Sequence, residues 1–218
     1  MFRPMMAAVL AFTFAGAALA EIETSSPDGL VQTSVAGIDV AYKRPDASID
    51  AYTKVMLGSI TVAFNKHWEK TPLPGSRFKM RAEDAQKIKN RLAAALREEF
   101  TAALKAGGYE VVEAAGDDVL EFAAAIADLY ISKPDVSGAA HADTYAVSAG
   151  EMVLVAELRD SASGAVLVRA YDREEARKTQ RPHFITGGEN EKEARLILKE
   201  WAAILVRQLD AARGKAAS

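Results

Sequence analysis

The chain contains no cysteine, and this absence excludes several kinds of site at once. Disulfide frameworks, cysteine nucleophiles and thiolate metal sites all need that side chain. A bacterial lipid anchor is also attached to cysteine, so we expect no lipid anchor. Stability must therefore come from a packed core, which a chain of 218 residues with 50% hydrophobic residues is large enough to form.

Histidine is scarce, and its three positions form no metal-binding pattern. His67, His141 and His183 lie far apart, and none belongs to a His-xxx-His or Glu-His pair at motif spacing. No Gly-x-Ser-x-Gly sequence marks a serine nucleophile, and no glycine-rich turn carries the Lys-Ser/Thr of a phosphate-binding loop. The sequence thus identifies no catalytic residue, no metal site and no cofactor.

An excess of charge of one sign is also absent. The 27 basic and 30 acidic residues give a formal net charge of −3. With a pI near 5.7, the chain offers no general attraction for the phosphate backbone of nucleic acid. We therefore expect no nucleic-acid partner, and the composition is typical of a globular protein.

One long uncharged run is present, at the N-terminus. Arg3 precedes an apolar stretch over residues 4–20, which ends in the small-x-small pattern Ala-Leu-Ala that signal peptidase recognises. A retained membrane helix is the weaker interpretation, because the run is short and no polybasic flank follows it. We expect a signal peptide over residues 1–20, a mature chain that starts at Glu21, and a periplasmic or secreted protein without a transmembrane span.

The rest of the chain predicts a single domain over residues 51–213, preceded by a turn-rich linker over residues 21–50. Alternating β-branched and aromatic residues from Tyr52 indicate a first strand. Apolar residues then recur at three- and four-residue steps from about residue 83 to 106, which predicts an amphipathic helix. A second such stripe, from about residue 190 to 212, predicts a second helix.

The segment between residues 109 and 131 is ambiguous. Its alanines favour a helix, whereas its apolar residues alternate at period two. We interpret it as two strands, over about 109–114 and 118–131. Together these elements predict an α+β domain with a mixed or antiparallel sheet of about five strands, in the order strand, helix, four strands, helix. Both helices should share one face of the sheet, because their two apolar stripes need the same dry surface.

Residues 150–174, GEMVLVAELRDSASGAVLVRAYDRE, predict a hairpin in which Gly164 adopts a left-handed conformation and Ser161 pairs with Ala165. Four charged side chains interrupt its apolar runs: Glu157, Arg159, Arg169 and Asp172. The predicted pairs are Leu158 with Val168, Ala156 with Ala170, Glu157 with Arg169, Val155 with Tyr171 and Arg159 with Leu167. This register gathers the charges on one face, which we interpret as solvated sheet surface rather than a catalytic cluster.

Two motifs of the chain are distinctive as a pair: Tyr-Xaa-Lys-Val at the start of the first strand and Glu-Leu-Arg-Asp-Ser-Xaa-Xaa-Gly in the hairpin. With the helix between them and residues 108–129, they resemble a family of small secreted bacterial proteins, many of them envelope lipoproteins, known as a domain of unknown function. The resemblance covers most of the mature chain. It implies an α+β fold and an envelope location, and it brings no active site. This chain differs from lipidated members because it lacks the anchoring cysteine.

Candidate partner-binding residues lie in the predicted loops. Trp68 follows His67 in a proline-rich segment, and exposed tryptophan is a frequent interface hot spot, although it can equally cap a core. The basic residues Arg177, Lys178 and Arg181 would suit an anionic envelope component, although neighbouring glutamates offset them.

The sequence therefore favours a periplasmic or envelope-associated accessory protein that binds another envelope protein or a cell-wall component without catalysis. The alternative is a hydrolase or a small-ligand-binding protein whose site is assembled only in the fold. The sequence determines neither the partner nor the oligomeric state.

Overall fold

The computed structural model describes residues 28–66, 81–131, 149–175 and 187–214. Their strands are β1 (Val31–Thr33), β2 (Val40–Lys43), β3 (Lys54–Phe64), β4 (Glu110–Val112), β5 (Val119–Ile131), β6 (Ala149–Asp160) and β7 (Val166–Glu175). Their helices are α1 (Ala82–Ala106) and α2 (Gly187–Ala212). The strands form one mixed sheet in the order β1-β2-β7-β6-β5-β3-β4. The predicted α+β class is confirmed.

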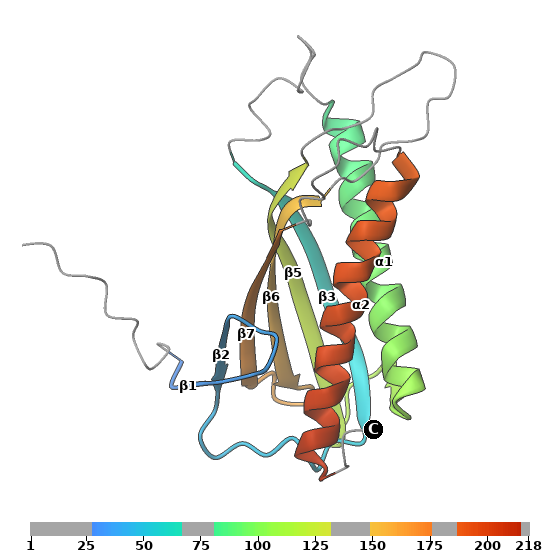
Figure 1. Cartoon of the computed structure of the whole chain (residues 1–218). Coiled ribbons are helices and arrows are strands. Elements are labelled where there is room, and N and C mark those ends of the chain that lie inside the picture. Colours follow the sequence, from blue (N-terminus) through green and yellow to red (C-terminus); the bar gives the residue numbers. More distant parts are fainter. Residues whose placement is uncertain (1–27, 67–80, 132–148, 176–186, 215–218) are drawn as a thin grey trace, which may run out of the picture.

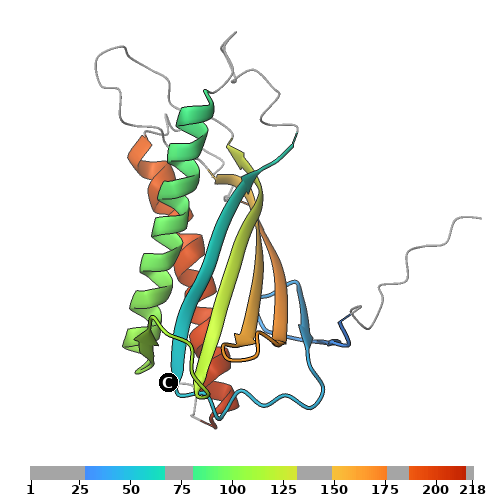
Figure 2. The ribbon, with the colours of Figure 1, turned by 180° about the vertical axis from the view of Figure 1, so that it is seen from behind.

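Both helices lie on one face of the sheet, as predicted, and Figures 1 and 2 show them side by side. They run in the same direction, because Arg195 of α2 pairs with Glu98 and Glu99 of α1, whereas Tyr109 just after α1 donates a hydrogen bond to Asp210 near the end of α2. Seen from behind in Figure 2, no helix of the described residues covers the opposite face of the sheet. The domain therefore has two layers.

The predicted count of about five strands is wrong, and β1 and β2 account for the difference. Both lie inside residues 21–50, for which the sequence predicts a linker. β2 pairs antiparallel with β7, and β1 pairs antiparallel with β2. Segments of three and four residues are too short to show a period of their own. Pairing with the edge of the hairpin, rather than local sequence, therefore makes them strands.

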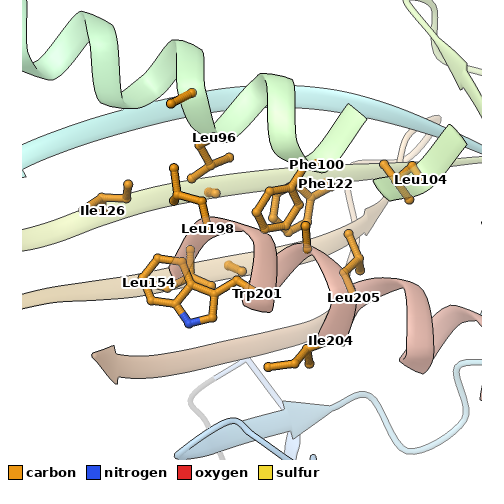
Figure 3. Packing of buried hydrophobic residues seen from close by; sticks show 14 of the residues in the cluster. Leu96, Phe100, Leu104, Phe122, Ile126, Leu154, Leu198, Trp201, Ile204 and Leu205 are labelled. Atoms are coloured by element: carbon orange, nitrogen blue, oxygen red, sulfur yellow. The ribbon is translucent and has the colours of Figure 1, made fainter. Parts of the chain in front are cut away.

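The segment after α1 forms strands, as we predicted, and the apolar residues of β5 meet the helices. Phe122 of β5 stacks on Phe100 of α1, with ring centroids 4.6 Å apart and an interplanar angle of 21°. Figure 3 shows this stack near Trp201 of α2, whereas Ile204 projects from the other side of that helix. The core thus lies between the two helices and the sheet.

β3 carries apolar residues of both parities because it changes register in the middle. Its pairing with β5 shifts between Leu57 and Ile60, which marks a β-bulge. Arg97 of α1 donates hydrogen bonds to the carbonyl oxygens of Leu57 and Gly58, at 3.0 and 2.9 Å. The side chain of Glu121 lies over Gly58, in the space that a Cβ would occupy, so a larger residue at this position would require Glu121 to move. The apolar residues before the bulge, Val55 and Leu57, and those after it, Ile60, Val62 and Phe64, therefore all belong to the core or pack against it.

The hairpin of β6 and β7 has most of the predicted register. The pairs Leu158–Val168, Ala156–Ala170, Glu157–Arg169 and Val155–Tyr171 are confirmed, and Gly164 is left-handed with φ of 72°. The predicted pairing of Arg159 with Leu167 is wrong, because the register shifts after Leu158 and Arg159 pairs with Val166. The predicted pairing of Ser161 with Ala165 is replaced as well: the amide of Ser161 donates to Val119 of β5 instead. The hydrogen bond to β5 therefore takes the place of the predicted last pair of the hairpin.

Candidate functional site

The domain contains an apolar cavity of about 310 Å³ between α2 and the helix-facing side of β2, β6 and β7. This volume is at the lower end of the range found for small-molecule sites, roughly 300–1,000 Å³. From α2 it is lined by Trp201, Ile204, Leu205, Gln208 and Ala212. The remaining lining residues come from the sheet, from α1 and from the segment around β1 and β2.

A row of four alanines explains why space remains there. The strand pairings place Ala124 of β5 beside Ala156, Ala156 beside Ala170, and Ala170 beside Ala41 of β2, so that the row crosses four adjacent strands. Ala41, Ala156 and Ala170 line the cavity. Leu154 and Leu158 flank Ala156 on the same face of β6, because side chains two residues apart share a face. These larger side chains hold α2 away from the sheet, and the alanines between them leave the gap unfilled.

The segment from Leu30 to Arg44, which includes β1 and β2 and which we call the strap, forms one wall of the cavity. Four of its residues line the cavity at the end of β1 and in the loop that follows: Thr33, Ser34, Val35 and Ile38. Gly37, with φ of 83°, approaches α2 so closely that an added Cβ would lie 3.0 Å from Cδ1 of Ile204. The strap therefore packs directly on α2.

A buried carboxylate joins the strap to the cavity. Asp172 of β7 is only 4% exposed. Its Oδ2 accepts a hydrogen bond of 2.7 Å from the indole Nε1 of Trp201, and its Oδ1 accepts one of 3.0 Å from the amide of Asp39 in the strap. The carboxylate of Asp39 in turn accepts a hydrogen bond from the amide of Arg173. Asp172 thus satisfies polar groups of α2 and the strap at once and orients Trp201, which lines the cavity.

The sequence interpretation placed Asp172 with the other charges of the hairpin on the solvated face, and this was wrong. Asp172 pairs with Leu154 and therefore points to the helices. The sequence could have predicted this position of Asp172. Extending the predicted pairs Leu158–Val168 and Ala156–Ala170 by two more residues gives the pairing of Asp172 with Leu154. The partner, Trp201, comes from a helix that local pairing does not place.

The other three charges of the hairpin form an ion-pair network on the face away from the helices. Oε1 of Glu157 accepts a hydrogen bond of 2.7 Å from Arg169, and Oε2 accepts one of 2.8 Å from Nε of Arg159. Arg169 also pairs with Asp28 at 2.6 Å. Burial raises the pKa of Glu157, but the hydrogen bonds from the two arginines outweigh this effect and hold the pKa below its usual value. Both carboxylate oxygens are therefore engaged in a structural role.

The cavity holds no pair of groups suited to acid–base catalysis. Among the described residues that line it, only Lys43 and Glu157 have ionisable side chains. The carboxylate of Glu157 is bound by the arginines on the other face of the sheet. General acid–base chemistry needs a donor and an acceptor that converge on one point. The arrangement instead suits the binding of an apolar group.

The residues proposed from sequence for partner binding, Trp68, Arg177, Lys178 and Arg181, lie outside the described residues. The three histidines, His67, His141 and His183, also lie outside them. Within the described ranges, no three acidic or histidine side chains are grouped closely enough to hold a metal ion. No helix of this part of the chain has the length and apolar character needed to cross a membrane.

A comparison with protein families matches residues 23–205 to the family described as protein of unknown function, DUF3313. The chain belongs to this family. The expectation of a family with a domain of unknown function is thereby confirmed. No curated protein matches this DUF3313 chain.

Several solved structures are similar to the structure of this DUF3313 protein, at low sequence identity. The PelC dodecamer from Paraburkholderia phytofirmans is 15% identical, with a TM-score of 0.38, over 80% of this chain and 95% of that one. A DUF330 protein from Xanthomonas campestris is 15% identical, with a TM-score of 0.42, over 76% and 91% of the two chains. A minor lipoprotein from Acinetobacter baumannii is 11% identical, with a TM-score of 0.33, over 74% and 95%. Likeness at this level does not extend to function.

Proposed function

We propose that this DUF3313 protein is a non-catalytic binding protein of the cell envelope, and that its ligand is an apolar chain held in the cavity beneath the strap. The observation that carries the proposal is the cavity of about 310 Å³, whose lining is mostly apolar and has no converging acid and base among the described residues. The envelope location rests on the predicted signal peptide over residues 1–20. The geometry thus supports one part of the alternative that the sequence left open, the small-ligand-binding protein, in place of the protein or cell-wall partner that the sequence favoured.

The size of the cavity sets the scale of the binding energy. At roughly 30 Å³ for a group the size of a water molecule, the cavity takes about ten such groups. Burying ten methylene groups contributes roughly 8 kcal/mol, and the loss of translational and rotational freedom costs at least about 4 kcal/mol. At most about 4 kcal/mol of binding energy therefore remains, which corresponds to a dissociation constant of about 1 mM or weaker for a chain that fills the cavity.

Trp201 provides the readout. The chain has two tryptophans, so the variant Trp68→Phe leaves Trp201 as the one remaining tryptophan. This variant of the mature protein is titrated with hexanol, octanol, decanol and dodecanol, and binding is followed by tryptophan emission and by native mass spectrometry. We expect the affinity to rise with chain length and then to level off when the cavity is full. Unchanged emission and no bound alcohol in the mass spectrum, at any chain length, would contradict the proposal.

A further inference from the structure

The mouth of the cavity carries a single lysine, and we infer from it that the ligand is an amphiphile with an anionic head group, a carboxylate or a phosphate. The inference rests on the proposed function and adds the class of ligand to it. Lys43 lines the cavity, yet its side chain is exposed to solvent, so it lies where the cavity opens. An amphiphile whose tail fills the apolar interior would leave its head group at this opening.

The strand register places Lys43 on the correct side of the sheet. Ala41 and Lys43 of β2 pair with Ala170 and Val168 of β7, all of which line the cavity. Side chains two residues apart in a strand share a face, so Lys43 lies on the same face as Ala41 of the alanine row, toward the opening of the cavity. A lysine in such a position covers apolar surface with its methylene groups and keeps its ammonium group in water.

The charge of Lys43 is not neutralised within the lining. Among the residues that the structure describes, none forms an ion pair with Lys43, and Thr33, Ser34 and Gln208 add only neutral polar groups to the lining. The nearby carboxylate of Asp50 is exposed; its pKa is lowered mainly by a hydrogen bond from Ser48 and, to a lesser degree, by the charge of Lys43. An anion at the mouth would therefore meet the ammonium group of Lys43 and several neutral hydrogen-bonding groups of the lining, while the exposed carboxylate of Asp50 lies near the same lysine.

Ligands that share one tail and differ in head group separate this inference from the binding of the tail. The Trp68→Phe variant is titrated with dodecanol, dodecanoate, dodecyl phosphate and dodecylammonium at low ionic strength and below micelle formation. An exposed ion pair changes affinity by about two- to five-fold. We expect at least one of the two anions to bind more tightly than dodecanol by this factor, and dodecylammonium to bind less tightly.

Substitutions at Lys43 then test its role directly. Lys43→Gln should remove the preference for the anion, Lys43→Glu should reverse it, and Lys43→Arg should retain it. Lys87→Glu is the matched control, because it makes the same change of charge at an exposed position of α1 that does not line the cavity. The binding of dodecanol should be the same in all these variants, which also shows that each one is folded.

The possible outcomes separate the two proposals. Equal binding of the four ligands, or a preference that survives Lys43→Glu, would overturn the inference about the head group, while binding of dodecanol would still support the proposed function. Failure of dodecanol itself to bind would remove the proposed function. Where the inference holds, tighter binding of dodecyl phosphate indicates a phospholipid, and tighter binding of dodecanoate indicates a free fatty acid.

Discussion

The substitution Ala156→Leu places three additional carbon atoms on the floor of the cavity. Ala156 lies at the centre of the helix-facing side of β6, lines the cavity and is 8% exposed. It pairs with Ala124 on one side and Ala170 on the other, so no large side chain stands directly beside it in the sheet. The substitution therefore tests whether the space that the alanines leave is open.

The expected magnitudes follow from the volume. Three carbon groups of roughly 30 Å³ fill about 90 Å³, well below the volume of the cavity, about 310 Å³. Their burial is worth up to about 2.4 kcal/mol, from which imperfect packing subtracts. A net gain of about 1 kcal/mol corresponds to a rise in melting temperature of roughly 2–4 °C for a domain of this size. The same carbons displace part of an alkyl ligand and should weaken its binding by up to about 50-fold.

The assay combines thermal unfolding with the titration of dodecanol described above. Ala125→Leu is the control, because Ala125 is the neighbour of Ala124 in β5 and faces the other side of the sheet, where it pairs with Val155. We expect the control to change stability by no more than about 0.5 kcal/mol and to leave binding unchanged. If Ala156→Leu lowers stability by about 1–3 kcal/mol, as overpacking does, and binding is unaffected, the reasoning from the alanine row is refuted.

Three further predictions concern single side chains. Asp172→Ala leaves the indole of Trp201 and the amide of Asp39 in the strap without their hydrogen-bond acceptor. It should lower the free energy of unfolding, measured with urea, by about 2–4 kcal/mol. Asp172→Asn should lower it by less. The folded state lowers the pKa of Glu157 from its ordinary value of 4.5. The stabilising contribution of this carboxylate is therefore present above pH 4.5 and is lost as the pH falls below it. Glu157→Gln should lose less melting temperature than the wild type as the pH falls below 4.5. Burial and a hydrogen bond to Asp210 raise the pKa of Tyr109 to about 12. Burial and a hydrogen bond to Asp160 raise the pKa of Tyr52 to about 12 as well, so the absorbance of tyrosinate should show groups that titrate near pH 12, one of which Tyr109→Phe removes.

Each of these predictions has an outcome that contradicts it. Wild-type stability of Asp172→Ala would mean that the buried carboxylate does not hold Trp201 and the strap together. An acid dependence of Glu157→Gln that is identical to the wild type would show that the ion pairs of Glu157 with the two arginines contribute nothing to stability. Since the folded pKa of Tyr109 exceeds the value of 10.0 for the free side chain, stability should fall as the pH rises from 10 toward 12. A tyrosine titration that ends near pH 10 would therefore contradict the predicted burial of this hydroxyl group.

Local patterns in the sequence predicted the elements with strong periodicity. The helix expected over residues 83–106 is α1 at Ala82–Ala106, and the strand chosen over residues 118–131 is β5 at Val119–Ile131. The register of the hairpin was also predicted, since turn chemistry and alternation both act between residues that are close in sequence. The pairing of Ala156 with Ala170, half of the alanine row, followed from this local information.

The tertiary structure alone decided the rest of the candidate site. Ala41 joins the alanine row only because β2 pairs with β7, more than a hundred residues away in sequence. The contact of Asp172 with Trp201 depends on where α2 lies over the sheet. A cavity is a volume that no side chain fills. The periodicity of the sequence predicts which residues face the core, but it does not predict whether the volumes of their side chains fill the space between the helices and the sheet. Hydrophobic patterning therefore determined the layers of this protein, whereas packing between distant segments determined the space between them.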